Sequence, residues 1–301
     1  MASILKQDQI LIEDFEIKRQ KLSIRRDLIQ IKDTITFELN RNLKKFYIML
    51  VVYFCIFILS FLIYQTMENL GIPIPTNSAE YLREYLGNFF GLLLAICGSA
   101  FGGSIIAEDY ARQTGNLLFP KINKARLLSG RLIARFFLMA ICLLFFYVLI
   151  GIVTFVKYQD LPFTILNSYG WGLFFTFTLL SFVTLISSFM KNTSMTIIFS
   201  ILFSLIIFEM IPMILSVAGV LNNNELPMFF MLNYYGAIVS WSVAMPVSRY
   251  LVKVQGPPGS QFETPSWLTP NEIGAAIGMI IYIIFMLSLA YIIYYRRQCK
   301  S

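Results

Sequence analysis

The stretch Glu108-Asp-Tyr-Ala-Arg-Gln-Thr-Gly-Asn-Leu-Leu-Phe-Pro-Lys-Ile-Asn-Lys-Ala-Arg-Leu-Leu-Ser-Gly-Arg131 separates two strongly apolar segments of the chain. Five bases lie within it, and a sixth, Arg135, follows directly. The flanking residues 88–107 and 136–155 contain no charged side chain. At 1.5 Å per helical residue, each is long enough to cross about 30 Å of hydrocarbon. The pattern predicts a helical membrane protein in which a polar, basic connection joins two spans.

The composition supports membrane insertion and argues against catalysis. The chain has 301 residues, of which 57% are hydrophobic and 14% charged, whereas soluble domains are about 45–50% apolar and about 25% charged. There is no histidine, no phosphate-binding GxxxxGK[ST] loop and no metal-ligand spacing among the four cysteines. We therefore expect no catalytic residue, no metal and no cofactor on this chain.

The apolar runs predict an all-α protein with six transmembrane helices, at residues 46–66, 88–107, 136–155, 171–190, 194–220 and 273–295. Residues 1–45 read as a polar segment that carries an amphipathic helix along the membrane surface. Residues 221–272 read as an extracytoplasmic segment with one or two short re-entrant or surface helices over 226–246, and residues 296–301 as a tail. We expect no cleaved signal peptide.

The distribution of basic residues sets the topology. With six spans, 20 of the 24 Lys and Arg residues fall on the side that holds both termini and the 108–135 connection, and four fall on the other side. The positive-inside rule places the first side in the cytoplasm. The net charge of +7 is thus assigned to topology and to anionic lipid headgroups rather than to nucleic acid.

The connection at 108–135 is too long for a simple turn. We expect Glu108–Leu118 to continue the helix of the second span, Pro120 to end it, and Asn123 or Ser129 to start the return helix. Such a helical elbow would act as a lever on two spans. A plain basic loop fits the residues as well, and the physics leaves the two open.

Three features inside the spans are candidates for packing or gating. Gly98 and Gly102, and likewise Gly274 and Gly278, form small-xxx-small faces that let another helix approach closely. Glu209 is the ionisable residue that falls within a predicted span, and Pro212 follows it. Because a charge there is costly, we expect either a gate or pathway site or a structural hydrogen bond.

A family resemblance enters through the elbow. The pattern Glu108, Thr114, Leu118, Pro120, Leu127, Gly130 and Arg131 resembles the signature after the second span of ABC-2-type transporter permeases. Here Gln113 precedes Thr114, where the family usually has glycine, and Arg131 stands where lysine is common. The layout of an amphipathic N-terminal helix, six spans and a long segment between the last two spans is also similar, and it covers nearly the whole chain.

The resemblance implies a permease subunit in the plasma membrane that exports a substrate by ATP-driven alternating access. Its partners would be a second copy or a related permease, the lipid bilayer, and separate ATP-binding subunits that carry the ATP and Mg²⁺. Those subunits would dock on the N-terminal helix and on the elbow, and spans two and five would line the path. The implied coupling residues are Glu108, Arg112, Thr114, Pro120, Lys121, Lys124, Arg126, Gly130 and Arg131.

Two alternatives belong to other functional classes. One is a non-transporting immunity or scaffold protein that holds partners through its small-residue helix faces. The other is an ion-driven secondary transporter that uses Glu209. The sequence identifies neither the substrate nor whether the second permease subunit is identical, and fold resemblance does not supply that information.

Overall fold

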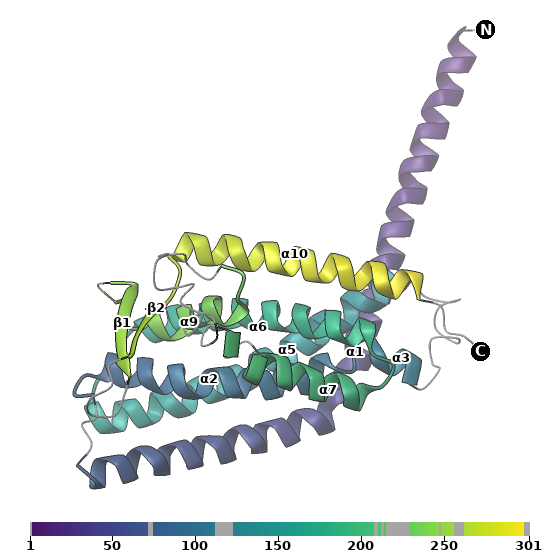
Figure 1. The fold of residues 1–301 in the computed structure, drawn as a ribbon. Coiled ribbons are helices and arrows are strands. Elements are labelled where there is room, and N and C mark those ends of the chain that lie inside the picture. The colour runs from purple at the N-terminus through teal and green to yellow at the C-terminus, as the bar shows by residue number, and fades with distance from the viewer. Residues whose placement is uncertain are drawn as a thin grey trace.

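A computed structural model describes residues 2–71, 75–111, 123–207, 210–211, 214, 229–246, 248–255 and 262–297, with side chains described from residue 27 onward except in 250–267. Within these ranges five helices are long and apolar enough to cross a membrane. They are α1 (Ala2–Asn69), α2 (Ser78–Gly102), α5 (Lys124–Tyr158), α6 (Thr164–Phe189) and α10 (Glu272–Arg296). Figure 1 shows α2, α5, α6, α10 and the later part of α1 running roughly side by side.

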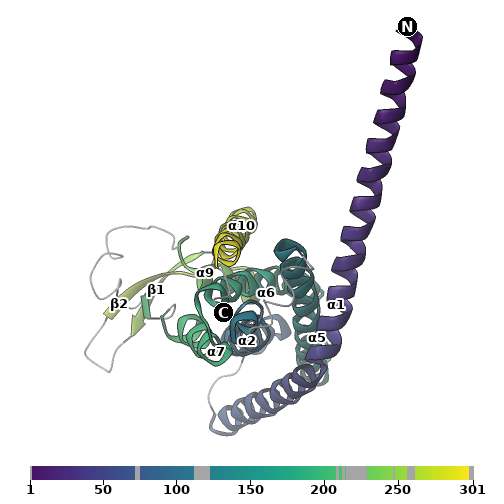
Figure 2. The same ribbon diagram turned by 90° about the vertical axis from the view of Figure 1, so that its right-hand side faces the viewer.

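Helix α1 combines two predicted segments in one element. It contains neither proline nor glycine, and it is continuous from Ala2 to Asn69. Its N-terminal part nevertheless stands at a steep angle to the bundle, whereas its later part runs along it (Figures 1 and 2). If the bundle crosses the membrane, the N-terminal part lies closer to the membrane plane, which is the direction predicted for the amphipathic segment.

The junction after α2 corrects the predicted elbow. Helix α2 ends at Gly102, residues 103–106 form a turn, and a short helix, α3 (Ala107–Ala111), follows. The helix of the second span therefore does not continue straight through Glu108. The turn is buried, and Ser187 of α6 supplies hydrogen bonds to its backbone. The Ser187 hydroxyl donates to the carbonyl of Gly103 and accepts from the backbone N–H groups of Ile106 and Ala107.

The return helix and the fifth predicted span are described in part. Asn123 caps α5 by accepting from the backbone N–H of Ala125, so of the two predicted starting residues, Asn123 and Ser129, the structure has the first. Helix α7 (Thr193–Leu202) continues as a π-helical turn over Phe203–Ile207. Most of residues 208–228 lie outside the described residues, so a sixth span remains a prediction.

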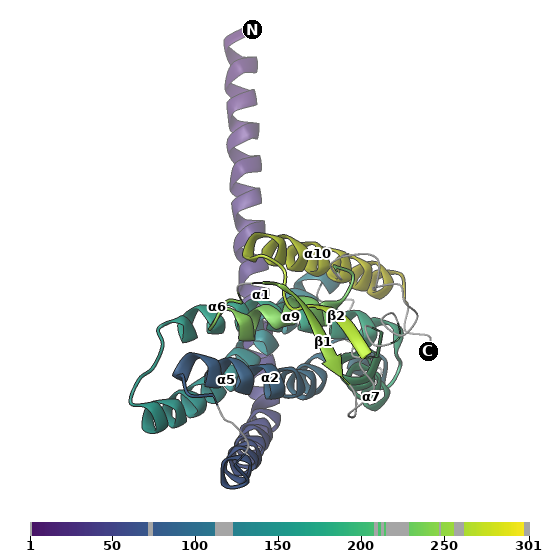
Figure 3. The ribbon, with the colours of Figure 1, turned by 60° about the vertical axis from the view of Figure 1, so that its left-hand side comes forward.

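Strands β1 (Tyr250–Gln255) and β2 (Phe262–Trp267) are not part of the all-α prediction, and they correct it locally. They pair antiparallel, with Tyr250 opposite Trp267 and Gln255 opposite Phe262. Valine and aromatic residues favour strands, and the sequence Gly-Pro-Pro-Gly between the two strands is rich in residues that break helices. Helix α9 (Leu232–Trp241) agrees with the short helix expected in 226–246, and Figure 3 shows the hairpin beside it.

Close helix contacts in the bundle use one of the two predicted glycine faces in full, and only Gly278 of the other. A Cβ on Gly98 would meet Leu179 at 3.0 Å, and one on Gly102 would meet Val183 at 2.7 Å, so α6 packs against this face of α2. Gly278 lies against Tyr235 of α9. Gly274 instead belongs to the first turn of α10, where Asn271 caps its backbone N–H.

Candidate functional site

A buried cluster of charged side chains occupies one end of the bundle. We call it the charge cluster and define it as Glu38 and Arg41 of α1, Glu108 and Asp109 of α3, and Arg131 and Arg135 of α5. The α1 residues precede the predicted first span, and the others lie within or next to the elbow. The cluster is therefore at the end of the molecule that the charge distribution predicts to be cytoplasmic.

Glu38 is the centre of the cluster. One carboxylate oxygen accepts from Nε of Arg131 at 3.1 Å, and the other accepts from Arg135 at 3.2 Å. Arg41, one turn further along α1, lies 2.7 Å from the same carboxylate. Asn42 also donates to it, at 3.1 Å. The Glu38 side chain is 1% exposed, so a single carboxylate in a nearly dry position holds three guanidinium groups.

Arg131 links the elbow to both neighbouring helices. Its two terminal nitrogens donate to the two carboxylate oxygens of Asp109 at 2.7 and 2.8 Å, which is the bidentate geometry of strong guanidinium–carboxylate pairs. It also donates to the backbone carbonyl of Ile105 at 2.7 Å. Arg131 thus fixes α3 and the turn before it against α5, while its contact with Glu38 fixes α1.

Arg135 lies one turn further into α5 and is fully buried. It donates to the carbonyl of Phe101 at 2.5 Å and to the hydroxyl of Ser104 at 2.7 Å. The helix breaks at Gly102, so the carbonyl of Phe101 and the hydroxyl of Ser104 in the following turn are directed towards α5. Arg135 therefore supplies hydrogen bonds that the broken end of α2 cannot make internally.

The charges within the cluster balance. Three carboxylates face three guanidinium groups, and Lys45 lies nearby with its ammonium 3.3 Å from the Ser104 hydroxyl. Glu38 precedes the first predicted span. Burial raises its pKa, but Arg135, Arg131 and Arg41 together lower it more, so the pKa lies below its ordinary value. The carboxylate is ionised and keeps its three partners at neutral pH.

Helix α10 joins the same end through its C-terminus. The Tyr294 hydroxyl donates to Asp109 at 2.8 Å. Lys124, the first residue of α5, donates to the carbonyls of Tyr294, Tyr295 and Arg297 at 3.2 to 3.3 Å, which compensates the unpaired carbonyls at the helix end. Arg297 in turn donates to the carbonyls of Ser188 and Met190 at the end of α6. The start of α5 is thereby tied to the last predicted span.

The N-terminal helix presents its polar face to the protein. Thr34, Glu38 and Asn42 lie four residues apart and are buried, and a Cβ on Gly130 would meet two side-chain atoms of Thr34 at 2.8 Å. Leu28 and Phe37 are each 62% exposed on other sides of the helix. This inverts the usual pattern of a soluble helix, and it suits a helix whose apolar side faces lipid.

The predicted coupling residues fall into two groups. Glu108, Lys124, Arg126, Gly130 and Arg131 all contact other parts of this chain, and Arg126 pairs with Asp27 at 2.8 Å and with Gln30. Arg112, Thr114, Pro120 and Lys121 lie outside the described residues, as do Glu209 and Pro212 of the candidate gate. Docking of a partner on any of them remains a prediction.

Sequence reasoning missed four of the six residues of the charge cluster. Glu38, Arg41, Asp109 and Arg135 were not among the predicted site residues, nor were Tyr294 and Arg297. One signal was present: Arg131 and Arg135 are four residues apart at the entry of an apolar helix, so both lie on one face. Two arginines on that face predict nearby carboxylates, but the sequence does not say which of the acids supply them.

The fold and the charge cluster together define the class of protein. It is a multi-pass helical membrane protein with buried ion pairs at the end where its basic residues gather. Residues 5–299 match the family described as "ABC-2 family transporter protein", so the chain belongs to this family of membrane transport components. Among curated proteins, none matches the chain. The permease class inferred from the elbow pattern is thereby confirmed.

Proposed function

We propose that this chain is the membrane-spanning subunit of an ATP-driven exporter and that separate ATP-binding subunits dock at the end that carries the charge cluster. The observation that carries the proposal is the way Arg131 and Arg135 tie the return helix of the elbow to α1 and α3. If a partner subunit displaced this end, several helices would move together, because the contacts between them are short, buried and charge-assisted.

The proposed mechanism needs no nucleotide chemistry on this chain. ATP and Mg²⁺ would be held by the partner subunits, and their closure would push on the elbow and on the N-terminal part of α1. The hydrogen bonds of Lys124 and Tyr294 connect α10 to the same end, so α10 would move with it. The spans would then rock between inward-open and outward-open arrangements, with both termini of the chain in the cytoplasm.

A second membrane subunit is part of the proposal. Helix α10 leaves large apolar side chains exposed along the single chain, including Ile277, Ile281, Ile284 and Phe285. Lipid covers such a surface as readily as protein, so the support for a second copy comes from the family and not from this surface. Mass photometry of the purified transporter would distinguish one permease chain from two.

The docking proposal is tested by reversing charge on the elbow. The full chain would be purified from its own membrane, and peptides of a co-purifying ATPase would be quantified by mass spectrometry. The double variant Arg112→Glu/Lys121→Glu is expected to lose most of the ATPase and to keep the elution profile of the wild type. The matched control, Arg83→Glu/Lys157→Glu, reverses two bases on the side predicted to face outward and should retain it.

The outcomes separate the functional classes. Retention of the ATPase by the elbow variant would refute docking at this site. Absence of any ATPase from the wild-type preparation would refute the exporter proposal itself and favour a protein without an ATP-driven cycle.

A further inference from the structure

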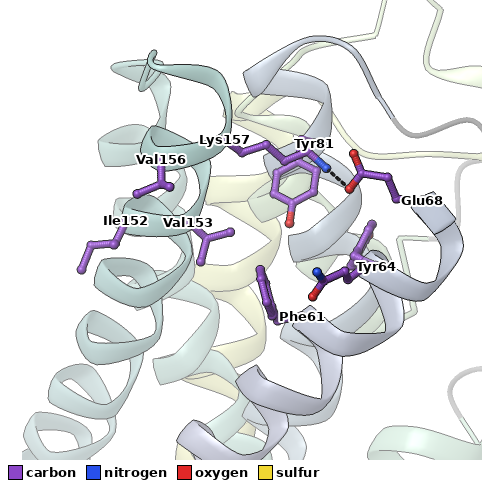
Figure 4. Close-up of a pocket in the computed structure, with 9 residues that line it drawn as sticks. Phe61, Tyr64, Glu68, Tyr81, Ile152, Val153, Val156 and Lys157 are labelled. Carbon is purple, nitrogen blue, oxygen red and sulfur yellow. Dashed lines mark hydrogen bonds and ion pairs between the residues drawn. The ribbon is translucent and has the colours of Figure 1, made fainter.

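A cavity of about 410 Å³ opens between α1 and α5 at the end of the bundle opposite the charge cluster. Its lining includes two contrasting kinds of side chain: Phe61, Ile152, Val153 and Val156 are apolar, whereas Glu68 and Lys157 are charged. Tyr64, Gln65 and Tyr81 complete the lining. Figure 4 shows the charged pair at one end of the cavity and Phe61 on an earlier turn of α1, away from that pair. The volume is within the range of about 300–1,000 Å³ that is usual for small-molecule sites.

The two kinds of side chain are separated along the helix axes. Glu68 lies at the last turn of α1 and Lys157 at the last turn of α5, so both charges are at the helix ends. Phe61 precedes Glu68 by about two turns, which is roughly 10 Å at 1.5 Å per residue. In a bilayer, the charged part of the cavity would lie at headgroup level and the apolar part at the level of the first acyl carbons.

The charged pair can exchange its partners at little cost. The Lys157 ammonium lies 2.8 Å from the Glu68 carboxylate, and the side chains are 30% and 54% exposed. An ion pair exposed to this extent contributes little to stability, because water screens both charges. A ligand that brings one negative and one positive group would satisfy Lys157 and Glu68 separately, without leaving either charge unpaired.

Aromatic rings give the same end of the cavity an affinity for cations. The Lys157 ammonium lies 5.6 Å from the ring centre of Tyr81, and Tyr64 packs edge-on against Tyr81 with ring centres 5.4 Å apart. Both tyrosines line the cavity. Ring faces attract an alkylammonium group, so an amine bound by Glu68 would keep a favourable environment after Lys157 turns to a phosphate.

We propose that this cavity binds a zwitterionic phospholipid of the outer leaflet, with its phosphate on Lys157, its amine on Glu68 and the start of an acyl chain against Phe61, Val153 and Val156. The assignment to the outer leaflet rests on the proposed function, because it uses the topology in which both termini are cytoplasmic. The rest of the proposal does not depend on it. An anionic lipid would satisfy Lys157 but meet Glu68 with like charge. A soluble zwitterion would leave the apolar half of the cavity unfilled.

The test is photo-crosslinking of the purified full chain in detergent, without any ATPase. The probes are phosphatidylethanolamine and phosphatidylglycerol that carry a diazirine near the start of one acyl chain, and labelled peptides are identified by mass spectrometry. In the wild type, we expect phosphatidylethanolamine to label residues 61–68 and 152–157 several-fold more than phosphatidylglycerol. Equal labelling by the two lipids would overturn the proposal.

Three variants sharpen the assignment. Glu68→Gln should reverse the preference towards phosphatidylglycerol, because only the positive charge remains. Lys157→Gln should reduce labelling by both lipids roughly tenfold, the scale of one lost charge-assisted contact. Val153→Trp should fill the apolar part and block both lipids. Lys32→Gln, which removes an exposed lysine at the opposite end, is the matched control and should behave as the wild type.

A competition arm identifies the source of the headgroup. Excess lysophosphatidylethanolamine should displace the probe, and glycerophosphoethanolamine, which has the same headgroup without an acyl chain, should not. Displacement by the soluble compound would overturn the lipid assignment. Because no ATPase is present, a failure here is distinguishable from a failure of the docking experiment.

Discussion

The two ends of this bundle are held together by different chemistry. At the elbow end, Glu38, Arg131 and Arg135 form a buried charge network in which each group depends on the others. At the opposite end, the rings of Tyr64, Tyr81 and Tyr85 pack together, with Tyr64 and Tyr85 stacked at 5.4 Å. Both ends bury polar atoms, but among the residues that the structure describes only the first end buries full charges.

The difference concerns how each end responds to change. A buried ion cluster tolerates little displacement, because a charge that loses its partner in a dry site is strongly destabilised. Packed tyrosines keep most of their contacts through small shifts, since ring packing is less directional than a bidentate ion pair. The elbow end thus suits the transmission of a load, and the aromatic end suits local rearrangement around a bound molecule. Four substitutions probe this comparison.

The largest effect is expected from Glu38→Gln. The change preserves side-chain size but leaves Arg131 and Arg135 without their shared carboxylate, and breaking a buried pair costs about 3–5 kcal/mol. The midpoint of thermal unfolding, followed by size-exclusion chromatography in detergent, should fall markedly. Glu84→Gln, at an exposed carboxylate of α2, is the control. Equal midpoints for the two variants would contradict a central role for Glu38.

A smaller loss is expected from Gly130→Ala. The added Cβ would meet Thr34 at 2.8 Å, so α1 must move away from α5. Overpacking of this kind costs about 1–3 kcal/mol. Gly91→Ala in α2 meets no atom within 4 Å and should be neutral or stabilising. The comparison is read from the same unfolding midpoints, and a neutral Gly130→Ala would show that the two helices are not in close contact there.

At the aromatic end, Tyr158→Phe removes a hydroxyl that donates to the carbonyl of Pro75 at 2.6 Å. The ring is kept, so the expected loss is that of one hydrogen bond, about 0.5–1.5 kcal/mol. Tyr47→Phe, at an exposed ring, should not change the unfolding midpoint. A loss as large as that of Glu38→Gln would mean that the two ends do not differ in the way described.

The smallest effect is expected from Glu68→Gln. It breaks an ion pair with Lys157, as Glu38→Gln does with its arginines, but both partners are partly exposed. We expect a change of less than about 1 kcal/mol, together with the altered lipid preference described above. A large loss of stability would argue that the pair is structural and would weaken its assignment as a headgroup site.

Much of the fold was predictable because hydrophobic length is a local property. The long apolar runs predict helices that the structure contains at 124–158, 164–189 and 272–296, and Asn123, one of two candidates for the start of the return helix, is its cap. The break after Gly102 was not predicted. It depends on Ser187, which is remote in the chain and supplies the hydrogen bonds that a continuous helix would have made for itself.

The amino-acid sequence by itself determined the class of the protein, the approximate positions of its long apolar helices and the end of the molecule at which its bases gather. These follow from the cost of placing charges and unpaired backbone groups in hydrocarbon, which applies residue by residue. Tertiary structure decided which acids meet Arg131 and Arg135, and it brought Glu68 to Lys157. Those pairings join different helices, and their geometry depends on how the helices pack rather than on spacing along the chain.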